Sequence, residues 1–186
     1  TKTGLKDYYV SQKDYNGKFG TKDVISPIKS STGEERFYVM ALNDVVKDGK
    51  NEFAWYWAAE SEKMNDYLSI TSSDFGKGKT NTATMISKWN SKAYGEQNQN
   101  ANYKDMWGQI QTEFSNGWFV PSTEELCAFA GELGITIDNY DEKGLWYYWT
   151  SSNYDYDSAY YASFPDDYMD FSDMYGYNYV RLSATF

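Results

Sequence analysis

Aromatic side chains restrict the fold of this chain more than any other feature of its sequence. Its 186 residues include 19 Tyr, 10 Phe and 7 Trp, far more than a disordered segment carries. These rings need a packed interior, and a chain of this length can bury roughly 70% of its unfolded surface without a disulfide. We therefore expect one folded domain over residues 1–186.

The scarcity of two other residue types excludes several kinds of chemistry. The chain has no His, which removes Ser-His-Asp and Cys-His nucleophile pairs and every His-ligated metal. Its one Cys, Cys127, cannot form an internal disulfide or a thiolate cluster, and its apolar neighbours predict a small buried side chain. We expect no catalytic activity, no bound metal and no cofactor.

Charge and hydropathy narrow the range of partners. The 17 Lys and Arg residues oppose 27 Asp and Glu residues, so the formal net charge is −10, and binding to nucleic acid is not expected. No apolar run approaches the roughly 18 residues of a membrane span, so we expect no membrane insertion. The first residues do not resemble a signal peptide.

Residues 1–144 are expected to form a framework of short strands followed by helices. Apolar residues at a period near two predict strands, and polar stretches with Gly predict turns and loops. Apolar residues three or four apart predict helices, the first of them capped by Thr80 or Thr82. The predicted strands are 7–10, 18–29, 35–43 and 53–58, with a hairpin turn at 30–34 and a surface loop at 60–79; the predicted helices are 80–92 and 103–114.

A third predicted helix has the clearest signal. In the capping box Ser-Thr-Glu-Glu at 122–125, Ser122 accepts a hydrogen bond from a free amide, and Glu125 bonds back to the amide of Ser122. Gly134 is suited to end this helix. The apolar residues between these signals lie at helical spacing and predict a buried face made of Leu126, Phe129, Ala130 and Leu133.

Residues 145–186, which we call the tail, differ in composition. They contain ten Tyr, six Asp, six Ser and two Asn, and Arg181 is their one basic residue, with neither Lys nor Glu. Antibody recognition loops use this mixture, because Tyr provides rigid amphipathic contacts and small polar residues provide adaptable hydrogen bonds. A Tyr-rich sheet with rings packed between layers explains the composition equally well. Strands are predicted at 146–150, 159–164 and 177–186.

Several motifs resemble one known family. Residues 117–126, Gly-Trp-Phe-Val-Pro-Ser-Thr-Glu-Glu-Leu, are similar to a signature of the bacterial DUF1566-type domains. The family's later motifs follow in order as Tyr-Trp-Thr-Ser-Ser at 148–152, Ala-Tyr at 159–160, Phe164 and Val-Arg at 180–181, and residues 78–83 are similar to its helix entry. The resemblance implies an α+β, C-type lectin-like fold with mixed antiparallel sheets, two or three helices and long loops.

The tail also resembles that of variable proteins from diversity-generating retroelements, which commonly have this fold. Their variable regions are rich in AAY codons, and adenine substitution there yields Tyr, Asp, Ser and Asn but never Lys or Glu. The resemblance implies a variable ligand-binding region within 145–186 on a framework of 1–144. We assign Trp146, Trp149, Ala159, Phe164, Val180, Leu182 and Phe186 to the scaffold, with Tyr160, and expect Met169, Phe171 and Met174 to be partly buried. The expected contact residues are Asn153, Tyr154, Asp155, Tyr156, Asp157, Ser158, Tyr161, Ser163, Asp166, Asp167, Tyr168, Asp170, Ser172, Asp173, Tyr175, Tyr177 and Asn178.

This resemblance implies a non-catalytic protein that recognises a protein or glycan ligand on a cell or phage-receptor surface. The implied location is a bacterial cell surface or a phage virion. One alternative is a calcium-dependent carbohydrate-binding lectin or adhesin without diversification, in which Asp166, Asp167, Asp170 and Asp173 supply the oxygen ligands, although the triplet motifs of calcium-dependent lectins are absent. Another is glycoside hydrolysis by Asp155 and Asp157, but alternation in an exposed segment explains their spacing.

Overall fold

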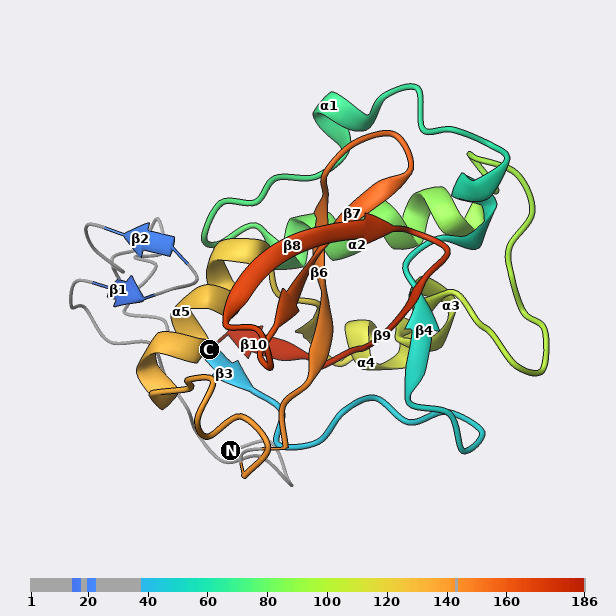
Figure 1. Cartoon of the computed structure of the whole chain (residues 1–186). Coiled ribbons are helices and arrows are strands. Elements are labelled where there is room, and N and C mark those ends of the chain that lie inside the picture. Colours follow the sequence, from blue (N-terminus) through green and yellow to red (C-terminus); the bar gives the residue numbers. More distant parts are fainter. Residues whose placement is uncertain (1–14, 18–19, 23–37, 143, 186) are drawn as a thin grey trace.

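The computed structural model describes residues 15–17, 20–22, 38–142 and 144–185 (Figure 1). Helices of the framework pack against a five-stranded sheet built mainly from the tail. The described residues form a mixed α+β structure, so the predicted class is confirmed. None of their helices has the length and apolar character that crossing a bilayer requires.

The tail supplies four of the five strands of the large sheet. Its order is β4-β9-β6-β7-β8, so β6 is central and β8 ends the sheet on one side. Strands β6, β7 and β8 pair as successive antiparallel hairpins, whereas β6 and β9 run parallel at the pair Tyr148–Tyr179. The bounds are β4 (Glu52–Ala54), β6 (Tyr147–Asn153), β7 (Ser158–Ser163), β8 (Tyr168–Asp173) and β9 (Tyr177–Tyr179).

A smaller antiparallel sheet brings the end of the chain back to the framework. In the order β3-β10-β5, Ala184 lies opposite both Val39 and Trp118. A separate hairpin pairs two further strands near the start of the chain. The bounds are β3 (Tyr38–Met40), β5 (Trp118–Phe119) and β10 (Ser183–Thr185), with β1 (Tyr15–Gly17) and β2 (Gly20–Lys22) in the hairpin.

Two hydrophobic cores lie on opposite sides of β6. Successive residues of a strand point to opposite faces, and accordingly Trp149 belongs to the first core and Tyr148 to the second. The first core takes Met85 and Trp89 from α2 (Gly78–Asn90), and the second takes the apolar face of α5 (Thr123–Leu133). The centre of the tail is therefore enclosed by framework helices.

Helix α5 confirms the capping-box prediction. The Ser122 hydroxyl accepts from the Glu125 amide at 3.4 Å, and the Glu125 carboxylate accepts from the Ser122 amide at 2.8 Å. Gly134 ends the helix in the left-handed conformation at φ 62°. Leu126, Phe129 and Ala130 are buried as predicted, and so is Cys127. The side chain of Leu133 lies outside the described part of the structure.

Helix α2 begins at Gly78, and the predicted caps at Thr80 and Thr82 are wrong. Lys77 precedes the first turn, and its side chain makes no capping bond. The hydroxyl of Thr82 donates to the Gly78 carbonyl at 2.7 Å inside the helix. A Cβ at Gly78 would lie 2.2 Å from a Glu125 carboxylate oxygen. Packing against the α5 capping box therefore fixes the start of α2, and helical periodicity carries no signal of that contact.

The helix predicted over 103–114 is two short helices, α3 (Met106–Gln109) and α4 (Gln111–Ser115). Ile110 separates them with φ −101° and ψ 6°. Tyr103 lies before both helices, in a turn where its amide donates to the Asn100 side chain at 2.6 Å. Its side chain is exposed.

The strand predicted over 53–58 is wrong beyond Ala54. A 3-10 helix, η1 (Trp57–Glu60), follows it, because the Trp57 amide donates at 2.8 Å to the Asp105 carboxylate and does not continue the ladder. The residues from Phe53 to Tyr56 are all buried.

The surface loop predicted over 60–79 has more structure than expected. It contains α1 (Tyr67–Ile70) and the first residues of α2. Met64 and Ile70 are buried in the first core, so this segment covers the sheet as well as connecting two elements.

For the tail strands, one prediction is wrong and one strand was missed. The strand predicted over 177–186 is two strands, β9 and β10, which belong to different sheets. Strand β8 was not predicted, although the turn before it carries a sequence signal. Pro165 and Asp166 lie at the centre of that turn, and Asp167 closes it with φ 59°, as Pro and Asp do in short turns.

The scaffold assignments are confirmed for most of the tail. Trp149, Ala159, Phe164, Val180 and Leu182 are buried, Tyr160 and Met169 are half-buried, and Met174 is fully buried. Trp146 and Phe171 are exposed, because Trp146 packs edge-on against Tyr140 at the surface and Phe171 lies on the outermost strand. Several predicted segments lie outside the described residues. They are the strand at 7–10, the turn at 30–34, Phe186, and those parts of 18–29 and 35–43 that belong neither to β2 nor to residues 38–43.

Candidate ligand-binding surface

Strand β6 is the rigid centre of the candidate surface. The five residues from Tyr148 to Ser152 are all buried. Trp149 Nε1 donates to the Phe53 carbonyl at 2.8 Å, and Trp55 Nε1 donates to the Thr150 carbonyl at 2.8 Å. These bonds span 96 and 95 residues of sequence, so the framework determines where β6 lies.

Arg181 fixes the other face of β6. Its Nε donates to Asp44 Oδ1 at 2.8 Å, and its terminal nitrogen donates to the Tyr148 hydroxyl at 3.1 Å and to the Gly144 carbonyl at 3.2 Å. Burial raises the pKa of Tyr148 well above its ordinary value, although Arg181 opposes that shift. Tyr148 is therefore a neutral phenol that accepts from a buried cation, in a framework role.

Asn153 anchors the turn between β6 and β7. Its side-chain oxygen accepts from the Thr71 hydroxyl at 2.5 Å, and its side-chain nitrogen donates to the carbonyls of Tyr67 at 3.0 Å and Asp155 at 3.2 Å. The prediction grouped Asn153 with the contact residues. Its amide group is occupied by these bonds, which hold the turn against α1.

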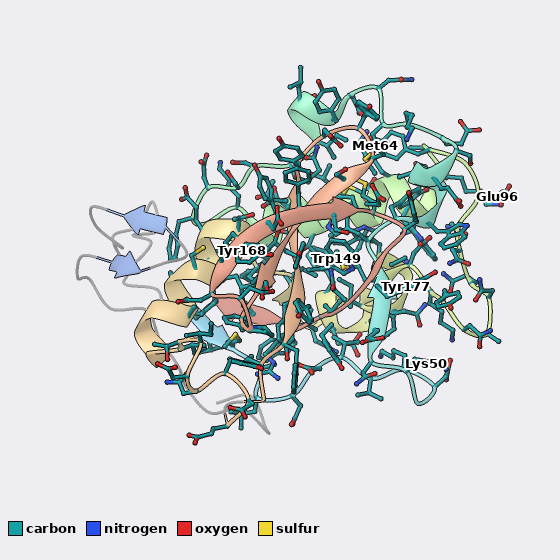
Figure 2. The ribbon with its side chains drawn as sticks, viewed as in Figure 1. Lys50, Met64, Glu96, Trp149, Tyr168 and Tyr177 are labelled. Carbon is teal, nitrogen blue, oxygen red and sulfur yellow. The ribbon has the colours of Figure 1, made fainter. Side chains whose placement is uncertain are left out.

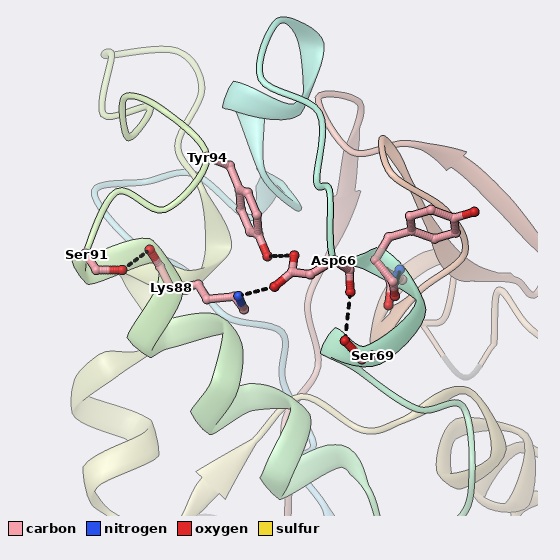
Figure 3. A network of polar contacts seen from close by, with 7 residues as sticks. Asp66, Ser69, Lys88, Ser91 and Tyr94 are labelled. Carbon is pink, nitrogen blue, oxygen red and sulfur yellow. Dashed lines mark hydrogen bonds and ion pairs between the residues drawn. The ribbon is translucent and has the colours of Figure 1, made fainter.

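The contacts of Asp66 fix α1 in turn (Figure 3). One carboxylate oxygen accepts from Lys88 Nζ of α2 at 2.5 Å, and the other accepts from the Tyr94 hydroxyl. Tyr67, the next residue, meets the Tyr156 ring edge-on at 6.0 Å. Contacts through Asp66 and Tyr67 therefore connect the 154–157 turn to the framework helix α2.

The 154–157 turn presents two tyrosines to solvent. Tyr154 and Tyr156 are 43% and 45% exposed. The Tyr154 ring stacks on Phe171 of β8 with 3.8 Å between centroids, and Tyr160 meets it edge-on at 5.3 Å. Three rings from the turn, β7 and β8 thus form one aromatic surface, and of these the sequence predicted only Tyr154 as a contact.

The acidic groups of this turn have local partners. Asp157 pairs with Lys63, whose ammonium also lies 5.2 Å from the Tyr156 ring centroid. Burial opposes the shift, but the hydrogen bonds from Lys63 and neighbouring groups hold the pKa of Asp157 below its ordinary value. Asp155 accepts from the amides of Asp157 at 3.0 Å and Ser158 at 2.8 Å. An ion pair and turn hydrogen bonds therefore hold Asp157 and Asp155 in place.

The opposite face of β7 and β8 carries a second group of candidates. Tyr161 of β7 lies opposite Asp170 of β8, and its ring meets Trp149 edge-on at 6.1 Å and Tyr147 at 6.3 Å. Burial, with smaller effects from Tyr168 and Asp170, raises the pKa of Tyr161 to about 12. Figure 2 shows Tyr168 near one end of β8, on the far side of Trp149 from Tyr177. Phenols therefore extend across the sheet.

Three candidates are buried, so their expected exposure is wrong. Ser158 is the first residue of β7, and its carbonyl accepts from the Tyr154 amide at 2.8 Å. Asp167 lies in the turn before β8, and its amide donates to the Phe164 carbonyl at 3.3 Å. Ser163 is buried and donates to Asp166 at 2.5 Å. The remaining candidates reach the surface: Asp166, Tyr168 and Asp173 are exposed, and Asp155, Asp157, Tyr161, Asp170, Ser172, Tyr175, Tyr177 and Asn178 are half-buried.

The four aspartates of the calcium alternative do not converge. Asp170 and Asp173 lie three residues apart on β8 and point to opposite faces. Asp166 and Asp167 belong to the preceding turn. Among the residues that the structure describes, no group of three or more His, Cys, Asp or Glu could hold a metal ion.

A second aromatic cluster joins the tail to the framework. Tyr103 stacks on Tyr177 with 4.0 Å between centroids, and Trp57 lies 6.4 Å from each of these rings. Tyr175 meets Trp57 edge-on at 6.3 Å. Sequence reasoning missed Trp57 and Tyr103 because it placed them in a strand and a helix. The turn-forming Asn residues before Tyr103 are the signal that could have corrected its assignment.

A buried carboxylate positions this second cluster. Asp105 accepts from the Trp57 amide at 2.8 Å, from Trp89 Nε1 at 2.9 Å and from the Asn98 amide at 2.8 Å. Burial raises the pKa of Asp105 to about 6, although these three donors oppose the shift. One side chain thereby holds both the segment that carries Trp57 and the loop that leads to Tyr103.

No model of a known protein family matches the chain, and no curated protein matches it significantly. The resemblance to DUF1566-type domains and to retroelement variable proteins stays a prediction. The geometry of the site is therefore the basis for the function proposed below.

Proposed function

We propose that this protein is a non-catalytic ligand-binding protein that displays a variable Tyr- and Asp-rich surface on a C-type lectin-like scaffold. The observation that carries the proposal is the division of the tail into two kinds of residue. The central strand β6 is buried and bonded to the framework, whereas Tyr154, Tyr156, Tyr168 and Phe171 are 40–45% exposed around it.

Exposed tyrosines held by a rigid support suit recognition. A Tyr ring offers a large contact at the entropic cost of two torsions, and a few such anchors supply most of the affinity of an interface. The proposed ligand is a protein or glycan on a cell or phage-receptor surface. A net charge of −10 favours neutral or basic partners.

Two features support the proposed lectin-like scaffold and its diversification. Strand β10 pairs with β3, which joins the end of the described chain to its framework, and β7 and β8 form an excursion between β6 and β9. The excursion contains Tyr, Asp and Ser, three of the residue types that AAY codons yield, and neither Lys nor Glu. We propose that a retroelement diversifies this segment and that the protein acts on a bacterial surface or a virion.

A display library tests the proposal. Positions 154, 156, 168, 170 and 173 are varied among Tyr, Asp, Asn and Ser, and the library is selected against a panel of unrelated soluble proteins. We expect normal display levels and specific binders to several targets. A matched library at the buried positions 148–152 should lose display, because those side chains pack in the cores and bond to the framework.

Two outcomes would contradict the proposal separately. A well-displayed library without binders to any target would remove the recognition role. Sequencing of the genomic locus tests diversification, since a nearby copy should differ from the gene at adenines of the tail codons. A locus without such a copy would remove diversification and leave the binding role in place.

A further inference from the structure

A groove lies beside the second aromatic cluster, on the β4–β9 side of the sheet. Its volume is about 370 Å³, within the range of small-ligand sites. Figure 2 shows Lys50 and Tyr177 on this side, away from Tyr168. The lining residues are Gly49, Lys50, Asn51, Glu52, Asn102, Tyr103 and Tyr177.

The first wall of the groove is a tight turn. Lys47 and Lys50 exchange backbone hydrogen bonds of 2.9 Å in both directions around Asp48 and Gly49. Both central residues have positive φ, 51° and 75°, which is the conformation that an Asp-Gly turn between antiparallel strands adopts. The residues between this turn and β4 are therefore held in a fixed position.

The second wall is the loop that ends at Tyr103. The Asn100 side chain accepts from the amides of Asn102 at 2.9 Å and Tyr103 at 2.6 Å. Lys104 Nζ then pairs with Asp48 at 2.5 Å and ties this loop to the turn of the first wall. Both walls are thus connected, and Asp105 holds the base of the loop from inside.

An open aromatic surface borders the groove. Tyr177 covers one face of the Tyr103 ring at a centroid distance of 4.0 Å, yet Tyr103 stays 41% exposed. The exposed part of the Tyr103 ring can therefore contact a ligand. The electron-rich face of such a ring attracts the C–H groups of a sugar, which carry partial positive charge.

Two side-chain amides without internal partners line the groove, beside one basic and one acidic residue. In the part of the chain that the structure describes, the side-chain amides of Asn51 and Asn102 make no hydrogen bond, and both residues are exposed. An amide both donates and accepts, Lys50 can donate and Glu52 can accept. The groove therefore offers both kinds of partner that hydroxyl groups need.

We propose that this groove binds a neutral carbohydrate without calcium, through stacking on Tyr103 and hydrogen bonds to Asn51 and Asn102. The opposite charges of Lys50 and Glu52 disfavour a strongly anionic or cationic ligand. The polar lining disfavours an apolar one. The site includes framework residues that diversification of the tail would leave unchanged, so it goes beyond the function proposed above.

Saturation-transfer NMR with a panel of neutral oligosaccharides tests this assignment in a buffer that contains EDTA. The panel holds glucose-, galactose-, mannose- and N-acetylglucosamine-based disaccharides, with sialyllactose as a charged control. We expect at least one neutral sugar to bind with a Kd of about 1 mM or tighter. Tyr103→Ala should weaken that binding about tenfold, and Asn102→Ala about fivefold, since one hydrogen bond is lost.

Matched variants separate this site from the variable surface. Tyr103→Phe keeps the ring and should keep binding, and Tyr168→Ala on β8 should leave it unchanged. Circular dichroism and thermal unfolding confirm that each variant is folded, which is expected because Tyr103 and Asn102 are exposed. The assignment is wrong if no neutral sugar binds, if binding requires calcium, or if Tyr103→Ala has no effect. Those results would leave the library selection at the 154–157 turn and β8 unaffected.

Discussion

Strands β6 and β8 share Tyr and Ser but lie in opposite environments. Both combine aromatic residues with Ser, and both belong to the tail. Residues 148–152 of β6 are buried between two cores, whereas no residue of β8 is fully buried. The Ser and Thr hydroxyls of β6 bond to framework segments, while Ser172 of β8 makes no side-chain hydrogen bond in the described structure.

The comparison explains why composition alone left two interpretations open. A Tyr-rich strand becomes framework at the centre of the sheet, where both faces are covered, and becomes surface at the edge. The interpretation as packed rings therefore describes β6. The exposure of β8 is compatible with the interpretation as a recognition surface, which stays a prediction. Substitutions at matched positions of β6 and β8 should separate the two roles.

The largest difference is expected between Trp149→Ala and Tyr168→Ala. Trp149 is fully buried and donates to the Phe53 carbonyl, so its truncation should lower the free energy of unfolding by about 4 kcal/mol. Tyr168 is 40% exposed, and its truncation should cost no more than about 0.5 kcal/mol. Urea unfolding measures both. Equal losses would contradict the division of the tail.

Removal of Arg181 should have the next largest effect. Arg181→Ala leaves the buried Tyr148 hydroxyl and the Asp44 carboxylate without their shared donor, and we expect a loss of about 3 kcal/mol. Arg181→Lys cannot reproduce the planar fork and should recover only part of it. A double variant with Asp44→Ala should cost less than the sum of the single changes, because both belong to one network.

Asn153→Ala should destabilise the protein by about 2 kcal/mol, since three side-chain hydrogen bonds are lost. Tyr156→Ala, three residues further along the same turn, should cost less than about 0.5 kcal/mol. Thermal unfolding of the two variants compares them directly. An Asn153→Ala variant as stable as the parent would return Asn153 to the group of ligand contacts.

Ser152→Ala and Ser172→Ala form the most conservative pair. The Ser152 hydroxyl donates to the Ser72 carbonyl at 3.0 Å and accepts from the Thr123 amide at 3.2 Å, so its loss should cost about 1 kcal/mol. Ser172→Ala should change stability by less than about 0.3 kcal/mol. Urea midpoints that coincide for the two variants would show that the β6 hydroxyls are not needed by the framework.

Local signals predicted the elements that local interactions form. The α5 capping box needs only residues 122–125, and its bonds are present. The start of α2 depends on Gly78 against Glu125, and the end of β4 depends on Asp105. These contacts join residues about 50 apart, so no periodicity within a short window contains them.

The candidate surface was predictable in composition but not in arrangement. The exposed tyrosines at 154, 156 and 168 follow from the tail sequence. The exposure of Phe171 depends on its place in the outermost strand, and the buried state of Ser163 depends on the turn that follows it. The cluster of Trp57 and Tyr103 with Tyr177 requires three distant segments to meet.

The unfolding free energy of one multiple variant tests the division of the tail most directly. Tyr154, Tyr156, Tyr168, Asp170 and Asp173 are replaced together by Ser or Asn, and unfolding in urea is compared with that of the parent chain. Because none of these side chains belongs to either core, we expect a folded protein within about 2 kcal/mol of the parent. A variant that fails to fold, or that loses more than about 4 kcal/mol, would mean that these residues hold the domain together and are not a replaceable surface.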